Sequence, residues 1–463
     1  MGSLLTSLYT GASGIYVNQT AVQVTGNNIA NVNTAGYTRQ TASITSSSPL
    51  EQGGIAYGTG STVDSISRAG DSFVTKQLIA QSATYGEYEA GSTPLSDIEQ
   101  ILSIGDTSLS SDIDSFFDAW EQLSTNPAGT SERQQVLQTA EDLADHFQQI
   151  DQQLTEVVES INSAIDSAIP SLNDHLQQIA ELNDSIMQTE ISGGNANTLR
   201  DQRDLLVQQV SETTGASTYT DEKGMVCLHL ENGLPLVTGN VTSSITTQKV
   251  NGLTQISIIS GQSSFSLDQE DFGGSLKGLL TVRDTSIPEV RNDVDRLTYE
   301  IATAVNTLHT SGIDRNGDAG VALFGLTAPV DPLAPAWEGA AASITLNIDA
   351  PALLAAGTSS LSGDNSLTLS MIALRDTASI NGASYSEEYA RIAANAGLLV
   401  SSNEQKLSSS VELLNEISTK RDAIAGVSSD EEMVLLIQYQ AGYEAASHYL
   451  SVIQEMLDTL LQI

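Results

Sequence analysis

The sequence predicts a mainly α protein with β insertions (α+β), elongated and divided into several domains. Three observations carry this prediction. The chain has 463 residues, about three times the length of an ordinary domain. Only 5% of its residues are aromatic, and long stretches keep the three- and four-residue apolar spacing of helices that pack along narrow seams. Two stretches rich in turn residues interrupt this spacing and favour strands and loops.

The first helix is expected from about Leu4 to Ile29. Apolar residues recur along it every seven places, the period of helices that wind around one another. These predicted seam residues are Leu8, Ile15, Val22 and Ile29. The second line of the seam is weak because it contains Gln19 and Gly26. A lone helix would have only a thin stripe to bury, so this helix needs partners.

The segment that follows, Asn27 to Tyr37, is rich in Asn, Thr and Gly, which turn the backbone. Six of its residues match the pattern ANxxTxGY in type and spacing. They are Asn28, Ala30, Asn31, Thr34, Gly36 and Tyr37. In this pattern, and in its place near the N-terminus, the chain resembles the flagellar axial proteins, the rod and hook family. Gly36 is expected to adopt a positive φ, which ends helices.

The resemblance extends to the other end of the chain. The segment from Leu436 to Ile463 is similar to the closing helix of the hook-filament junction members of that family. Thr198 to Gly215 and Ser275 to Val290 resemble the helical body of the same members. The resemblance implies a structural junction protein of the bacterial flagellum, not an enzyme, which connects hook to filament and assembles by its terminal helices.

Partners and location follow from the same resemblance. The implied partners are further copies of the chain in a ring or helical layer of the flagellar axis, the hook protein, a second hook-filament junction protein, and a flagellar export chaperone at the C-terminal helix. The implied location is extracellular, at the junction. Export is expected through the flagellar type III apparatus without a cleaved signal peptide.

The spacing patterns divide the chain into four parts. Terminal axial helices with an extended arm, which would form an inner tube, are expected at 1–67 and 428–463. A body of long helices is expected at 68–214, 275–310 and 377–427. An inserted β domain is expected at 215–274, and a second small insertion of loop and strands at 311–376.

Within the body, the helix that begins near Arg68 is expected to pause at Pro94. The next helix, Ser111 to Leu123, places aromatic side chains on one face, which is expected to be core. A long helix is expected to begin at a cap formed by Asn126 and Pro127, with Pro in the first helical turn. It runs to Gly193, and a further helix follows at Asn197 to Thr213.

The inserted β domain is predicted from alternating residues and turn dipeptides. Strands are expected at Met225 to Leu230 and Gln255 to Ser260. Asn232-Gly233 and Asn251-Gly252 favour tight hairpins.

The last helix is expected to start at a capping box formed by Ser429 and Glu432. Apolar residues then alternate steps of four and three, which predicts a coiled-coil seam. The predicted seam residues are Leu435, Tyr439, Ala446, Tyr449, Ile453, Met456 and Leu460. Because each terminal helix has an apolar stripe that it cannot bury alone, the two ends are expected to fold only when subunits stack in a tube. Pairing of the two ends within one subunit is the alternative.

Charge excludes several classes of partner. The formal net charge is −39, so phosphates would be repelled, and neither nucleic-acid binding nor membrane insertion is expected. No charged residue precedes Arg39, and no Lys or Arg follows Arg421. Both ends therefore differ from the acidic body.

No catalytic, cofactor or metal site is expected. Cys227 and His229 would share one face of a strand, and Asp314, Asn316 and Asp318 resemble a fragment of a calcium loop, for which a polar turn is the better interpretation. Two other functions stay open. One is another axial protein, hook or distal rod; a remote one is a secreted acidic adhesin or hydrolase.

Overall fold

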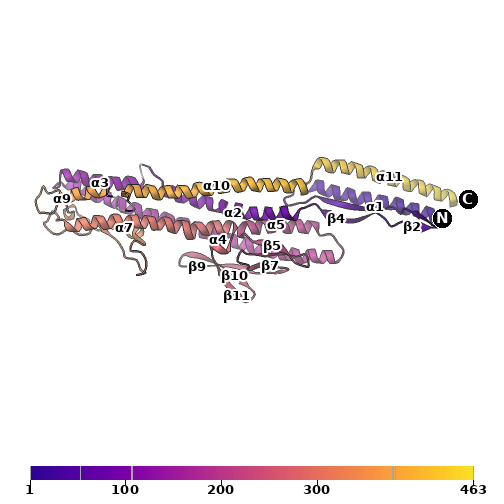
Figure 1. Cartoon of the computed structure of the whole chain (residues 1–463), viewed down its shortest axis with the longest axis horizontal. Coiled ribbons are helices and arrows are strands. Elements are labelled where there is room, and N and C mark those ends of the chain that lie inside the picture. The colour runs from indigo at the N-terminus through magenta and orange to yellow at the C-terminus, as the bar shows by residue number, and fades with distance from the viewer. Residues whose placement is uncertain (1, 53, 106–107, 378–379, 381, 462–463) are drawn as a thin grey trace.

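The computed structural model describes residues 2–52, 54–105, 108–377, 380 and 382–461. The molecule is a long rod, with helices along its longest axis and small sheets that project from one side of its middle (Figure 1). It is mainly α with small antiparallel β insertions, as the sequence predicts. The other residues of the predicted segments (1, 53, 106–107, 378–379, 381 and 462–463) lie outside the described part.

Two terminal helices form one end of the rod. Helix α1 (Gly2–Ala30) and helix α11 (Ser429–Leu461) run antiparallel, side by side (Figure 1). We call them the terminal pair. The sequence favoured ends that fold only on assembly, but the structure has the alternative, with both ends paired within one subunit.

Small residues let the two helices of the terminal pair approach closely. A Cβ added at Gly14 would lie 3.2 Å from the Cβ of Ala446, and one added at Gly442 would lie 2.5 Å from Oδ1 of Asn18. There is thus almost no room for side chains at these points. The close backbone approach explains how a helix with a thin apolar stripe finds enough contact.

The arm connects α1 to the body. Strands β1 (Gln40–Ser46) and β4 (Ser61–Arg68) pair antiparallel, and β2 (Leu50–Gln52) pairs with β3 (Ile55–Tyr57) at the tip. The hairpin lies along the terminal pair (Figure 1). Its return strand begins beside α1, where Ser61 N donates to Ser13 Oγ at 3.3 Å.

The body is a bundle of long helices. Its members are α2 (Ser72–Ile101), α3 (Leu109–Thr125), α4 (Thr130–Ile191), α5 (Asn197–Thr214), α6 (Gly274–Thr281), the π-helical segment η2 (Val282–Ser286), α7 (Ile287–Ser311) and α10 (Tyr385–Ala425). The aromatic face of α3 is core, as predicted: Phe116, Phe117 and Trp120 are at most 1% exposed. The ring of Phe117 stacks on that of Tyr385, with centroids 6.2 Å apart.

Two proline predictions fail in the body. Helix α2 continues through Pro94 instead of pausing there. The lost backbone hydrogen bond is offset by the burial of Leu95 and Ile98 in the next turn. The dipeptide Asn126-Pro127 does not cap α4: Asn126 ends α3, and α4 begins at Thr130.

The inserted β domain consists of two small antiparallel sheets. One contains β5 (Ser217–Thr220), β6 (Val226–His229), β7 (Pro235–Thr238) and β8 (Val241–Thr242); the other contains β9 (Ser244–Val250), β10 (Leu253–Ser260) and β11 (Ser263–Leu267). The short helix η1 (Gln269–Asp271) leads back to the body. The predicted hairpin turn between β9 and β10 is confirmed by the positive φ of Asn251 and Gly252, 51° and 82°.

Asparagines on α4 hold this domain in place. Asn183 Nδ2 donates to the carbonyls of Val226 and Gly239 at 2.8 and 2.7 Å. Asn173 binds both backbone groups of Ile245. Side-chain amides thus continue the sheet's own hydrogen bonding onto the helix.

The second insertion is largely loop and short strand, as predicted, but it also contains short helices that were not predicted. It contains β12 (Phe324–Gly325), β13 (Thr345–Leu346), the short helices α8 (Ala340–Ser343) and η3 (Pro351–Leu353), and the helix α9 (Ser366–Arg375). Helix α9 was missed because it is only ten residues long, and its buried large apolar side chains are Leu367 and Met371.

Candidate functional site

The segment after α1 turns back on itself to meet the body. Asn31 Nδ2 donates to Asn27 O at 2.9 Å, and Thr34 Oγ1 donates to Asn31 Oδ1 at 3.2 Å. Gly36 then has a φ of +77°, as predicted, and a Cβ at this residue would lie 3.3 Å from Leu205 Cβ on α5. The turn therefore brings the chain against the body and points Tyr37 back toward α1.

Asn28, near the end of α1, is the centre of a buried hydrogen-bond network. Its Nδ2 donates to Gln40 O and to Glu432 Oε2, both at 2.9 Å. Its Oδ1 accepts from Tyr37 Oη at 2.9 Å and from Gln40 N at 3.0 Å. Asn28 is 1% exposed. One amide side chain thus joins α1, the arm and the first turn of α11.

Glu432 completes this network from the C-terminal side. Its carboxylate is 1% exposed and accepts from Arg39 Nε at 2.7 Å as well as from Asn28. The predicted capping box of Ser429 and Glu432 is therefore wrong: the carboxylate points away from its own helix start. Glu431 N instead donates, at 3.5 Å, to Oγ of Ser428.

A second carboxylate fixes the arm to the body. Asp201 on α5 accepts from Thr38 N at 3.1 Å, from Thr38 Oγ1 at 2.6 Å and from Arg68 Nη1 at 2.9 Å. Arg68 also pairs with Asp204 at 2.7 Å. Burial acts to lower the pKa of Arg68, but the two carboxylates outweigh it and raise that pKa above its ordinary value. We call this set of residues the joint: Asn28, Tyr37, Thr38, Arg39, Gln40, Arg68, Asp201, Asp204 and Glu432.

Tyr37 is the residue of the joint whose protonation is most strongly affected. Burial, and then the carboxylates of Asp201 and Glu432, raise the pKa of its phenol to about 12. The neutral hydroxyl is thereby favoured, which is the form that donates to Asn28.

Comparisons with known proteins show which family the chain is similar to. Three family models match: "Flagella basal body rod protein" at residues 8–38, "Flagellar hook-associated protein FlgK helical domain" at 95–324, and "Flagellar basal body rod FlgEFG protein C-terminal" at 423–463. Flagellar hook-associated protein 1 of Bacillus subtilis (strain 168) is 28% identical over 100% of this chain and 98% of its own length. The chain belongs to the flagellar hook-associated protein 1 family.

Two further relatives agree. Flagellar hook-associated protein 1 of Escherichia coli (strain K12) is 31% identical over 68% of this chain, and the match spans 59% of that relative's length. The solved flagellar hook junction protein FlgK from Burkholderia pseudomallei has the same fold, with a TM-score of 0.68, 16% identity, and coverage of 75% of this chain and 100% of that one.

In this hook-associated family member, the motif residues divide into two groups. Asn28 and Tyr37 lie inside the joint, and Gly36 turns the chain into it. Ala30, Asn31 and Thr34 are at the surface or half-buried, and the latter two shape the turn.

The predicted seam residues of α1 lie beside the line that faces α11, whereas Ala446 and Tyr449 of the predicted α11 seam lie against Gly14 and Gly11 of α1. Leu8, Ile15, Val22 and Ile29 are half-buried, as are Leu435, Tyr439 and Ala446. Ile453 is buried, and Tyr449, Met456 and Leu460 are 42%, 49% and 57% exposed. The line of α1 that faces α11 runs instead through small residues such as Gly11 and Gly14.

Sequence reasoning missed the partners of the motif: Thr38, Arg39, Arg68, Asp201 and Glu432. One signal was available. Arg39 is the first charged residue of the chain and follows the motif directly. A lone cation beside an uncharged helix needs a carboxylate partner if it is to be buried.

The other candidate residues form no reaction centre among the described residues. Cys227 is buried, and His229 packs edge-on against Tyr219, with ring centroids 5.9 Å apart. Asp314 Oδ1 accepts from the backbone N–H groups of Asn316 and Asp318, which makes a polar turn. In the described part of the chain, no three His, Cys, Asp or Glu residues are grouped to hold a metal.

Proposed function

We propose that this protein is a structural junction component of the bacterial flagellum that connects hook to filament. Its terminal pairs would line up in an inner tube, with the body facing outward. The terminal segments, the body and the two insertions would then be separate domains of one subunit, of which the terminal segments make the assembly contacts.

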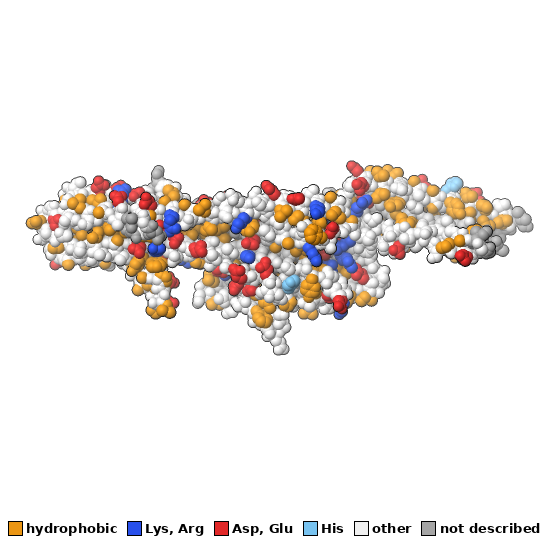
Figure 2. Space-filling view, in the orientation of Figure 1, with side chains coloured by type: hydrophobic (Ala, Val, Ile, Leu, Met, Phe, Trp, Pro, Cys, Tyr) orange, Lys and Arg blue, Asp and Glu red, His pale blue; other side chains and the backbone are white. Residues whose placement is uncertain are grey.

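One observation carries this proposal: the terminal pair, once formed, still exposes a large apolar surface. The exposed apolar residues are Leu5, Tyr9 and Tyr16 on α1, and Met433, Val434, Ile437, Tyr443, Tyr449, Val452, Met456 and Leu460 on α11. Figure 2 shows apolar side chains gathered along the terminal pair on the face in view. A surface of this extent on a monomer is typical of an interaction site.

The charge of the terminal pair suits close packing of many copies. Helix α1 has no charged residue, and α11 has no Lys or Arg. Copies that pack side by side in a tube through α1 would therefore bury no charged side chain of that helix. Contacts with other copies, with the hook protein on one side and with a second junction protein on the other would use this apolar surface.

The same surface suggests how the subunit is handled before assembly. An export chaperone would cover the exposed apolar face of α11, and the flagellar type III apparatus would deliver the chain to its extracellular site. No described helix has both the length and the apolar character needed to cross a bilayer.

A hook or distal-rod protein is the second candidate, because the motif is common to all axial proteins. Such proteins are mostly β between their terminal helices, whereas 63% of this structure is helical. The long body helices therefore favour the junction function.

The test is a deletion strain. We expect hooks of normal length that lack filaments, with flagellin released into the medium, and rescue by the wild-type gene. The double substitution Val434→Ser with Ile437→Ser should fail to rescue, because it removes part of the apolar surface of α11.

A matched control is available on the second insertion. Val330 and Leu333 are 101% and 92% exposed, and Val330→Ser with Leu333→Ser should rescue fully. Filaments on the deletion strain would refute the junction function. Equal rescue by both double variants would show that the apolar surface of α11 is not used.

A further inference from the structure

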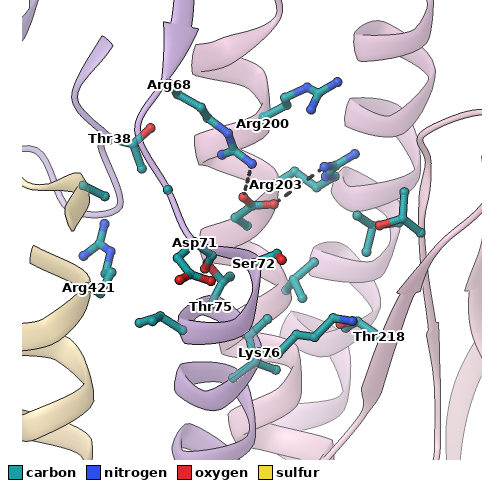
Figure 3. A pocket seen from close by; sticks show the side chains of 18 of the residues that line it. Thr38, Arg68, Asp71, Ser72, Thr75, Lys76, Arg200, Arg203, Thr218 and Arg421 are labelled. Carbon is teal, nitrogen blue, oxygen red and sulfur yellow. Dashed lines mark hydrogen bonds and ion pairs between the residues drawn. The ribbon is translucent and has the colours of Figure 1, made fainter. Parts of the chain in front are cut away.

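Positive charge is concentrated in one place on this acidic chain. The chain has 18 Lys and Arg residues against 57 Asp and Glu. Next to the joint lies a cavity of about 370 Å³, walled by the arm, α2, α5, β5 and the end of α10. Its cationic lining residues are Arg68, Lys76, Arg200, Arg203 and Arg421, and its anionic ones are Asp71 and Asp204 (Figure 3). Cations therefore outnumber carboxylates in a molecule where the opposite is the rule.

Arg203 is the buried cation of this cavity, at 4% exposed. Its Nη1 donates to Asn183 Oδ1 at 3.1 Å, and its Nη2 lies 3.7 Å from Asp204 Oδ1. Its Nε is buried and has no hydrogen-bond partner among the described residues. A buried N–H of a charged group left without a partner is costly, which points to a ligand that supplies an acceptor.

Three of the other cations have carboxylate partners outside the cavity lining: Arg68 pairs with Asp201, Arg200 with Glu190 and Arg421 with Asp422. Burial lowers the pKa of Arg203; Asp204 opposes this, and the nearby charges of Arg200 and Arg68 lower it further. Lys76 forms no ion pair with any described residue, although it lines the same cavity. The first turn of α2, with Ser72 and Thr75, also faces the cavity at the positive end of a long helix, where Asp71 caps the helix and Thr75 Oγ1 donates to Asp71 O at 3.0 Å.

We propose that this cavity binds an oxyanion, a carboxylate or phosphate group. Guanidinium and ammonium groups line the cavity from several elements and suit such a group, which would give Arg203 Nε the acceptor it lacks. A ligand here would bridge the arm, the body and the end of α10, all of which line the cavity. The oxyanion has two sources: a free multivalent anion, or an acidic side chain of a neighbouring copy. The second source rests on the proposed assembly function.

The first experiment titrates inorganic phosphate into the purified full chain at low ionic strength and measures heat by calorimetry. We expect saturable binding at one site. Lys76→Gln should weaken binding about tenfold, because it removes one unit charge near the anion. Arg203→Lys keeps the charge but removes Nε and should also weaken it.

A matched control changes the net charge equally at another place. Lys249 on β9 is exposed and does not line the cavity, so Lys249→Gln should bind phosphate like the wild type. Lys76→Gln removes an exposed side chain and should leave the melting temperature unchanged, which separates lost binding from lost folding. This calorimetric experiment uses the monomer, so its outcome does not depend on the proposed junction function.

The second experiment distinguishes the sources by following self-assembly with light scattering. If a neighbour's carboxylate occupies the cavity, Lys76→Gln slows assembly more than Lys249→Gln does, and added phosphate competes with assembly. If the ligand is a free anion, phosphate binds but assembly does not respond. Failure of both experiments to separate Lys76→Gln from Lys249→Gln would overturn the proposal.

Discussion

From the contacts of the joint, we predict that Asn28 and Asn31, two asparagines of one motif, contribute very differently to the stability of the docked terminal pair. Asn28→Ala removes four hydrogen bonds, one of them to the buried carboxylate of Glu432. Asn31→Ala removes bonds that are exposed and local to the turn. The two substitutions are chemically identical and lie three residues apart, so each controls for the other.

The magnitude follows from the contacts. The bond to Glu432 contributes roughly 1.5–3 kcal/mol and the three neutral bonds about 1 kcal/mol each. Replacing Asn by Ala in a helix returns roughly 0.5 kcal/mol, and water entering the site recovers part of the remainder. We therefore expect Asn28→Ala to destabilise the docking of the terminal pair by about 3 kcal/mol, and Asn31→Ala by less than about 0.5 kcal/mol.

Hydrogen exchange followed by mass spectrometry measures this locally. A loss of about 3 kcal/mol corresponds to exchange about 100 times faster in peptides of α1 and the first turns of α11. Peptides of α3 and α4, in the core of the body, should exchange as in the wild type. Equal exchange of α1 and α11 in the two variants would refute the central place given to Asn28.

Three further predictions follow from individual residues. Gly36→Val should fail to complement a deletion strain where Gly36→Asn succeeds, because φ is +77° and the β-branched residue is strained there by roughly 1 kcal/mol or more; equal complementation would contradict this. The neutral phenol of Tyr37 should stabilise the joint fully below pH 10, and this contribution should disappear as the pH rises toward about 12. Tyr37→Phe should lack that part of the alkaline loss in a melting-temperature series, and identical profiles would count against it. Gly442→Val should disrupt the terminal pair, since even a Cβ there would lie 2.5 Å from Asn18 Oδ1, whereas Gly26→Ala enters open space and should be tolerated; circular dichroism melting compares them.

The sequence predicted the long helices well because each has its own signal. The aromatic face of α3 and the apolar spacing along α4 are local features, and the structure has helices at both places. The hairpin at Asn251-Gly252 is also local, since only two residues decide its turn.

Contacts between distant segments were not predictable in the same way. On α1 the line that faces α11 runs through small residues such as Gly11 and Gly14, which apolar periodicity does not detect. Glu432 has the spacing of a capping residue, and only the fold shows that its carboxylate reaches Asn28, 404 positions away in sequence. The role of Asp201 was not predictable for the same reason. An acidic residue on a helix is expected to be solvated, and its partners are evident only once the position of the arm is known.

The most direct test of the account is whether the two ends pair within one subunit. Gly14 and Ala446 face each other so closely that a Cβ on the first would lie 3.2 Å from the Cβ of the second, near the spacing of a disulfide. We would introduce Gly14→Cys and Ala446→Cys in a Cys227→Ser background and oxidise the purified protein at high dilution. The account predicts an intramolecular disulfide in the monomer, formed faster than in a control that pairs Gly26→Cys with Ala446→Cys. No disulfide, or disulfides only between subunits after assembly, would show that the ends fold only in the assembled tube and would contradict the account.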